Sequence, residues 1–326
     1  MKKWIVAALT LALVLTSALA AAESVKTGLY VGADVSGSKS ATADAAGAVG
    51  STITLAAVTV DEDGVIDSCA LDVVLCSIGF DQEGKLTIST DTLFASKNEL
   101  GDAYGMRKAS AIGKEWNEQA AALAEFAVGK TAEQVSAIAV GEDGKATDVD
   151  LVSGCTIGVS GLIPAIVSAC ENAQDLGAQK GDRLALTSTT SISSSKDAAA
   201  DAEGAGQTYT FAAATTLSGE TITSSVIDAI IANVKFDATG AITSDLTAEI
   251  QSKNVLGDGY GMRKASAIGK EWNEQAAAFS AYVTGKTIEE VLGIPTEGGK
   301  ATEADLASGC TVSVSDMIAI IGKAAQ

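Results

Sequence analysis

The stretch YGMRKASAIGKEWNEQAAA occupies residues 104–122, and the same nineteen letters return at residues 260–278. Setting Phe80 against Phe236 extends the match in both directions at an offset of 156 residues. FDQEGKL then faces FDATGAI, FAVGKT faces YVTGKT, and DLVSGCT faces DLASGCT. A period of about 150 residues is too long for a solenoid repeat and is typical of paired globular domains. The chain therefore contains two copies of one unit.

The repeated block has the spacing of an amphipathic helix. Its apolar residues recur at intervals of three and four over residues 106–127 and again over 262–283. This spacing predicts a helix with a single apolar stripe. Trp116 and Trp272 lie on that stripe, so we interpret them as core anchors rather than as platforms for a planar ligand. Gene conversion limited to the block would also preserve its letters, so identity alone does not mark a functional site.

The residues that precede each block have the pattern of strands. STITLAAVTVDEDGVIDSCALDVV (residues 51–74) alternates and is rich in Val, Ile and Thr, with DEDG as a hairpin turn. Strands followed by helices predict an α+β fold, in which each repeat is an antiparallel sheet followed by packed helices. Two small-residue stretches, 32–50 and 187–207, contain too little apolar area to offset the cost of ordering. We interpret both as long, mobile loops or loosely paired edges.

The first residues have the pattern of a secretory signal peptide. MKKWIVAALTLALVLTSALAAAES carries two lysines, an apolar run and then small residues spaced as an A-x-A cleavage site. We assign residues 1–22 to this peptide, 23–174 to the first repeat and 175–326 to the second. No later stretch reaches the roughly 18 uninterrupted apolar residues of a membrane helix. The pattern predicts a protein that is secreted, periplasmic or on the cell surface, with no membrane span in the mature chain.

Charge and composition exclude several classes of function. The formal net charge is −19, and removal of Lys2 and Lys3 with the leader makes it −21. Such an acidic surface repels phosphate backbones and anionic lipids, so we expect neither nucleic-acid nor membrane-surface binding. The chain has no histidine, and so lacks the usual general base near neutral pH. A secreted hydrolase with paired carboxylates stays open, because 41 acidic residues give no basis for choosing a pair.

Two shorter strings resemble ligand motifs but are better explained as structure. GKT at Gly129 and Gly285 lacks the earlier glycine of a phosphate loop, since Ala124 and Ser280 stand there. DEDGVID could form a calcium loop, yet the matching turn of the second copy reads LSGETIT, and a hairpin turn explains both. We therefore predict no metal site.

A turn near the end of each repeat is the more specific candidate site. DLVSGCTIGVSGLIPAIVSA in the first repeat is answered by DLASGCTVSVSDMIAIIGKA in the second. Each turn is expected to expose a threonine hydroxyl ahead of a helix capped at Ser160 or Ser315. A phosphate there would meet free backbone N–H groups and the positive end of the helix dipole, whereas the alternative is a capped turn without a ligand. The candidate residues are Asp150, Ser153, Gly154 and Thr156, with Asp305, Ser308, Gly309 and Thr311.

These residues resemble the FMN-binding domain family. Its hallmark is Asp, two residues, Ser or Thr, Gly, Ala, and then Thr or Ser, followed by a helix. The upstream order of a tryptophan, an aromatic residue and GKT is also similar to that family, with Trp116 and Phe126 in one repeat and Trp272 and Tyr282 in the other. Cys155 and Cys310 depart from the family's alanine, and its Glu-Thr-Pro-Gly loop against the flavin ring is not found.

The resemblance implies a role for each residue of the turn. FMN would be the cofactor, and a separate flavin transferase would esterify its phosphate to Thr156 and Thr311. The serines and glycines of the two motifs would shape the turn, and Asp150 and Asp305 would orient it. The flavin itself would transfer the electrons to and from redox partners, so no catalytic residue is assigned to the chain.

Two functions follow from these observations. The leading hypothesis is an exported bacterial, flavin-binding carrier for extracytoplasmic electron transfer. The alternative is a cofactor-free cell-surface or secreted binding or structural module that retains the fold. Both describe a carrier or binding protein rather than a self-sufficient enzyme.

Overall fold

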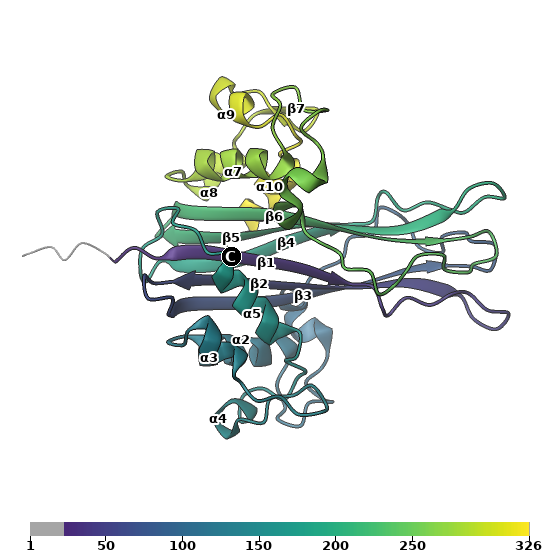
Figure 1. Cartoon of the computed structure of the whole chain (residues 1–326), viewed down its shortest axis with the longest axis horizontal. Helices are drawn as coiled ribbons and strands as arrows, with labels where there is room; N and C mark the ends of the chain where they lie inside the picture. Colours follow the sequence, from purple (N-terminus) through teal and green to yellow (C-terminus); the bar gives the residue numbers. More distant parts are fainter. Residues whose placement is uncertain (1–22, 326) are drawn as a thin grey trace, which may run out of the picture.

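The fold consists of two halves of the same design, each a three-stranded antiparallel sheet followed by short helices (Figure 1). The computed structural model describes residues 23–325, so the signal peptide expected at residues 1–22 lies outside the described residues. The expected α+β class is confirmed. The long strands are β1 (Lys26–Asp34), β2 (Gly47–Val60), β3 (Ile66–Phe80), β4 (Arg183–Ser191), β5 (Gly204–Ser218) and β6 (Thr221–Phe236).

Each sheet pairs its strands in chain order, so its last strand is an edge. The β2–β3 turn depends on an aspartate and a glycine: Asp61 Oδ1 accepts the Val65 N–H at 2.8 Å, and Gly64 has a φ of 76°. Both hairpins carry a bulge near the turn, between Thr59 and Val60 in one half and between Thr216 and Leu217 in the other. The repeat therefore preserves strand register as well as strand order.

The two sheets stack face to face, with β1 over β6 and β3 over β4. Their facing sides share one apolar cluster, to which Leu55 of the first sheet and Ile230 of the second contribute. The hydroxyls of Thr27 and Ser224 also form a hydrogen bond of 2.6 Å between the halves. Because each sheet covers the inner face of the other, neither half has a complete core alone.

Helices cover the two outer faces, which makes four layers in the order helix, sheet, sheet, helix (Figure 1). The first half contains α1 (Lys97–Leu100), η1 (Gly101–Tyr104), α2 (Trp116–Ala127), α3 (Ala132–Ser136), α4 (Val149–Val152) and α5 (Leu162–Glu171). The second contains α6 (Lys253–Leu256), η2 (Gly257–Tyr260), α7 (Trp272–Val283), α8 (Ile288–Leu292), the short strands β7 (Thr296–Glu297) and β8 (Lys300–Ala301), α9 (Ala304–Gly309) and α10 (Ser315–Lys323). Among residues 23–325, no helix combines the length and the apolar character needed to cross a membrane.

The repeated block is only partly helical, which corrects the sequence prediction. Helix α2 begins at Trp116 rather than at residue 106, and the preceding residues form a compact turn. Buried Glu115 stabilises that turn, because its carboxylate accepts the backbone N–H groups of Met106 and Arg107 at 2.8 Å each. The expectation that Trp116 and Trp272 are core anchors is confirmed, since their side chains are 5% and 3% exposed.

The two small-residue stretches are not loose loops, and this too corrects the prediction. Parts of them belong to long strands, and the rest docks on the other half at the far end of the sheets (Figure 1). There Ala41 N–H donates to Gly240 and Ala198 N–H donates to Gly84, both at 2.8 Å. A Cβ on Gly240 would come within 2.6 Å of the Ala41 methyl group. Small residues are therefore what lets these backbones approach each other.

Candidate functional site

The threonines of the predicted site lie on equivalent turns and are half-buried. Gln119 of α2 is fully buried, and its Oε1 accepts both the Thr156 N–H at 2.8 Å and the Thr156 hydroxyl at 3.0 Å. Gln275 accepts the same two groups of Thr311, at 2.8 and 3.1 Å. Each threonine hydroxyl thus already has a partner inside its own half, and its side chain also meets solvent.

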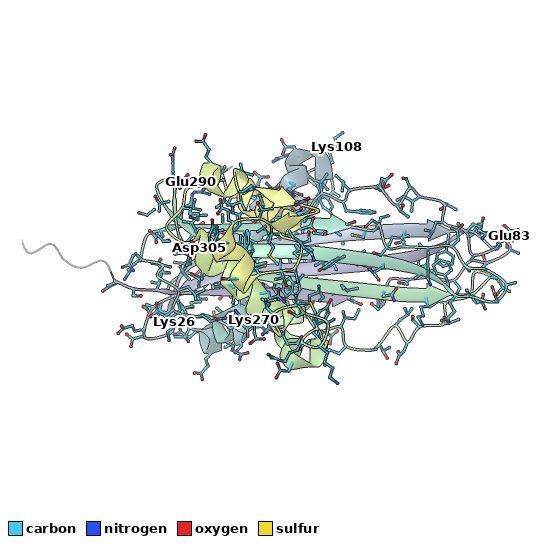
Figure 2. The ribbon with its side chains drawn as sticks, turned by 90° about the horizontal axis from the view of Figure 1, so that it is seen from above. Lys26, Glu83, Lys108, Lys270, Glu290 and Asp305 are labelled. Atoms are coloured by element: carbon cyan, nitrogen blue, oxygen red, sulfur yellow. The ribbon has the colours of Figure 1, made fainter. Side chains whose placement is uncertain are left out.

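The other residues of the motif close the turn. The Ser153 hydroxyl donates to the Asp150 carbonyl at 2.8 Å, and Ser308 does the same with Asp305. The two glycines of the motif pack closely against α2 and α7, because a Cβ added to either glycine would lie 3.0 Å from an alanine methyl group of that helix. Both aspartate side chains are exposed, and Asp305 projects from the outer helical layer, far from the strand tips marked by Glu83 (Figure 2). The packed glycines are Gly154 and Gly309.

The helix that follows each threonine starts one residue later than the sequence predicted in the first half and one residue earlier in the second. Helix α5 begins at Leu162 with Gly161 as its cap residue, and α10 begins at Ser315 with Val314 as its cap residue. Neither cap forms a side-chain hydrogen bond, so the predicted serine caps are wrong. Cys310, like its counterpart in the first repeat, is buried, and burial raises the pKa of its thiol to about 11. Each turn is therefore a packed structural connection that leaves its threonine hydroxyl partly accessible.

A second group of polar residues, which sequence reasoning missed, lies between each sheet edge and its helices. Asp72 of β3 is 3% exposed, and its Oδ1 accepts the N–H groups of Val73 and Asn98 at 2.8 and 3.1 Å. Asp228 of β6 makes the corresponding bonds with Ala229 and Asn254. Burial raises the pKa of both carboxyl groups to about 6. These aspartates attach α1 and α6 to the sheets.

The lysine beside each aspartate points into aromatic rings. Lys97 Nζ lies 4.9 Å from the Tyr104 ring centre and 4.8 Å from that of Trp116. Lys253 makes the same contacts in the second half and also donates to the Tyr209 hydroxyl at 2.5 Å. Lys253 is 4% exposed, and burial lowers its pKa to about 8. An ammonium held this way orders the aromatic core of its half.

Each half also has a groove between its edge strand and its long helix. The first groove, of about 380 Å³, lies between β3 and α2. The second groove, of about 400 Å³, lies between β6 and α7. The first groove is lined by Asp67, Ser68, Cys69, Ala70, Leu71, Asn98, Asn117, Ala121, Ala124, Glu125 and Val128. The second is lined by Gln174, Leu176, Ser225, Val226, Ile227, Asn254, Asn273, Ala277, Ser280, Ala281 and Thr284.

A pair of asparagines has the same place in both grooves. Asn98 donates its Nδ2 to the Leu71 carbonyl at 2.8 Å, and Asn254 donates to Ile227 at 2.9 Å. The second member of each pair has a side-chain oxygen that is buried and accepts no hydrogen bond from the described residues. Such an oxygen costs about 1–3 kcal/mol until a donor reaches it. These two acceptors are Oδ1 of Asn117 and Oδ1 of Asn273.

The sequence contains a signal for these grooves. The asparagines belong to the strings SKN and WNEQ, which are the same in both copies, and Asp72 faces Asp228 at the repeat offset. A charged residue within an otherwise apolar strand is expensive to bury without partners, so an aspartate there predicts a polar cluster. Neither string shows which element will lie opposite, because the groove depends on how α2 packs against β3.

Comparisons with known proteins do not identify the chain. No family model, no curated protein and no solved structure matches it significantly. The resemblance to FMN-binding domains therefore stays a prediction from the motif. The turns and grooves described above are the basis for assigning a function.

Proposed function

We propose that the protein is an exported binding module that holds a polypeptide partner in the grooves between its edge strands and helices. The observation that carries this proposal is the repeated asparagine pair, in which Asn117 and Asn273 each bury an unpartnered amide oxygen. In each groove a buried acceptor has no donor among the described residues, and this cost supports the proposal, whereas duplication alone would preserve the repeated block. The export is the expectation from the leader sequence.

The chemistry of the grooves suits a ligand rich in N–H donors. The walls are small or polar residues of α2 and α7 on one side and an edge strand on the other. An amide oxygen accepts a backbone N–H, and an edge strand offers both donors and acceptors to an extended chain. A polypeptide supplies matching groups at regular spacing, whereas a purely apolar ligand would leave the asparagine oxygen unpaired.

Filling the grooves tests this function. Ala121 and Ala277 are equivalent positions in the groove walls, so Ala121→Trp with Ala277→Trp should block both. Ala109→Trp with Ala265→Trp adds the same bulk to exposed positions of the turn and serves as the control. A displayed library of random peptides is selected on the mature chain, and the selected peptides are titrated by fluorescence anisotropy.

We expect the selected peptides to bind the wild type and the control and to lose affinity for the groove-filled variant. The filled variant is first compared with the wild type by thermal melting, so that loss of binding is not loss of fold. Peptides that bind the filled variant as tightly as the wild type would contradict the proposal. Failure of the library to yield any binder would contradict it as well.

A second candidate function is flavin attachment at Thr156 and Thr311. It is favoured by the half-exposed position of both hydroxyls on equivalent turns that match the motif. Mass spectrometry of protein from a host that flavinylates other proteins tests it. An FMN-sized addition on either threonine peptide would support the carrier hypothesis, with its transferase and redox partners. Unmodified threonines in that host, which we expect, would leave the binding module as the function.

A further inference from the structure

We infer that the first groove is the open binding site and that it takes an extended peptide segment with a basic side chain, added alongside the edge of β3. The inference rests on the proposed function and deepens it. It distinguishes the two halves, because the second groove is partly covered by a segment of the chain itself. Three independent features of the described residues support it.

The first feature is the segment that covers the second groove. After α5 the chain runs antiparallel to the start of β1, bridged at Thr27–Gln174 and at Ser24–Gln179. Thr27 and Gln174 exchange both backbone hydrogen bonds, at 2.8 and 3.0 Å. From this segment, Gln174 and Leu176 line the second groove beside β6. The protein thus already places a backbone segment against one groove.

The second feature is the free edge of β3 in the first groove. The outer edge of β3 is occupied at Ile66, which exchanges hydrogen bonds with Lys130 and Gly129, and at Leu71, which accepts from Asn98. Between these points, no hydrogen bond joins the backbone of residues 68–70 to a partner beyond the sheet within residues 23–325. Five consecutive residues of the strand line the groove. At about 3.3 Å per residue, this run matches a ligand strand of about four or five residues.

The asparagines lie where such a strand would need them. Asn98 already anchors α1 to the carbonyl of Leu71, the last residue of the free run. Asn117 lines the wall opposite, and its buried Oδ1 has no donor among the described residues. A backbone or side-chain N–H of the ligand would satisfy this oxygen. The alanines beside it, Ala121 and Ala124, leave room for the backbone to approach.

The third feature is charge. The charged residues that line the first groove are Asp67 and Glu125, and both are acidic. Asp67 Oδ2 already accepts the Gly181 N–H at 3.3 Å and lies near Lys180, so Glu125 is the carboxylate that a ligand cation would meet. In the second groove Ala281 stands at the position of Glu125, and none of the described residues that line this groove is charged. A ligand with a lysine or arginine would therefore be favoured in the first groove and not in the second. The carboxylate and the ammonium would form a partly exposed ion pair, which contributes modestly to affinity and more to selectivity.

The test uses two fluorescent peptides on the full mature chain. One has alternating valine and threonine around a central lysine, and the other has glutamate in place of the lysine. We expect the lysine peptide to bind the wild type at one site, with at least tenfold preference over the glutamate peptide. Asn117→Leu should weaken binding about tenfold, because a buried donor loses its acceptor. Glu125→Gln should weaken it about threefold.

Asn273→Leu is the matched control, since it makes the same change in the second groove. We expect it to leave the affinity of the lysine peptide unchanged. Ala121→Leu, which fills the first groove but keeps both asparagines, should weaken binding in parallel with Asn117→Leu and so covers the case in which one variant folds poorly. Circular dichroism of each variant checks the fold.

Three results would overturn the inference. These are the absence of binding by the lysine peptide, equal binding by the glutamate peptide, and equal loss of binding in the Asn273→Leu and Asn117→Leu variants. If library peptides depend on Ala277 instead of Ala121, the proposed function stands and only this choice of groove fails. The two proposals can therefore fail separately.

Discussion

The two halves of the molecule contain one identical block, yet they place its neighbouring lysine in different surroundings. Lys253 is buried under Tyr209, whereas Lys97 is half-exposed. The strand pairing shows why: Tyr209 lies opposite Ile231, and the corresponding position in the first half is Thr52, opposite Leu75. The block is the same, so the drifted strands decide the burial and the pKa of the lysine. An identical sequence is thus compatible with different chemistry in its two copies.

The same contrast applies to the grooves. Both grooves have the asparagine pair, which comes from α1 and α2 in the first half and from α6 and α7 in the second. Glu125 of the first groove corresponds to Ala281 in the second. The second also gains a wall from the segment that joins the halves. The second groove therefore lacks a carboxylate that the first groove has, and it gains a wall that the first groove does not have. Three substitution experiments test how far this contrast extends, beginning with the largest expected effect.

Removal of the tryptophans tests the packing that the halves have in common. Trp116→Ala and Trp272→Ala should each lower the free energy of unfolding by about 3–5 kcal/mol, because each deletes a large buried side chain. Trp272→Ala should lie at the upper end, since its ring also packs against Phe211 at 6.0 Å between ring centres. Denaturant unfolding followed by circular dichroism measures the change. A variant with native stability would contradict the core assignment.

The buried aspartates provide a pH test in which the halves should agree. Burial raises the pKa of Asp72 and Asp228 to about 6, above the usual value of about 3.9. The folded chain therefore holds these protons more tightly than the unfolded chain. The resulting stabilisation is complete below about pH 4 and is lost as the pH rises through about 6, on the order of 3 kcal/mol for each group.

Stability measured against pH in the wild type and in Asp72→Asn with Asp228→Asn checks this expectation. The double variant should lose most of the decline between pH 4 and pH 6, because asparagine does not titrate. The other acidic residues, most of them exposed, set the slope that remains. The two single variants should each remove about half of the effect. A single variant that removes all of it would show that the halves differ here too.

The lysines provide the smallest effect and the sharpest contrast. Burial lowers the pKa of Lys253 to about 8, so the folded chain holds this proton less tightly than the unfolded chain. Its contribution to stability should therefore rise as the pH increases above about 8, by on the order of 2 kcal/mol. Lys253→Met should abolish this rise between pH 8 and pH 9.5, and Lys97→Met should leave it. Equal slopes in both variants would mean that the lysines are equivalent.

Much of the fold was predictable because its signals are local. Alternation and the DEDG turn predicted β2 and β3, and the 3,4 spacing placed both tryptophans in the core. The start of α2 was wrong by ten residues, because Glu115 binds the backbone of Met106 and Arg107 and ends the apolar stripe in a turn. The spacing of apolar residues cannot predict such a hydrogen bond between a side chain and backbone groups eight or nine residues away.

The site was less predictable than the fold. The motif placed Thr156 and Thr311 on turns. Their hydrogen-bond partners, Gln119 and Gln275, lie 37 and 36 residues away in the chain, and the motif does not predict them. The free edge of β3 follows from strand order, yet the groove follows from the way α2 packs against it. Asn117 looks like an ordinary surface residue of a helix until its oxygen is seen to be buried.

By itself, the sequence determined the duplication, the arrangement of strands before helices in each copy and the burial of Trp116 and Trp272. These depend on spacing within a few turns or strands. Only the tertiary structure decided that the sheets stack on each other, that their small-residue tips dock on the opposite half and that one groove is covered. These features need close contact between residues often more than a hundred positions apart, such as Thr27 with Ser224. Alanine, glycine and serine permit such contacts because they are small, but their spacing in the sequence does not predict which residues they will contact.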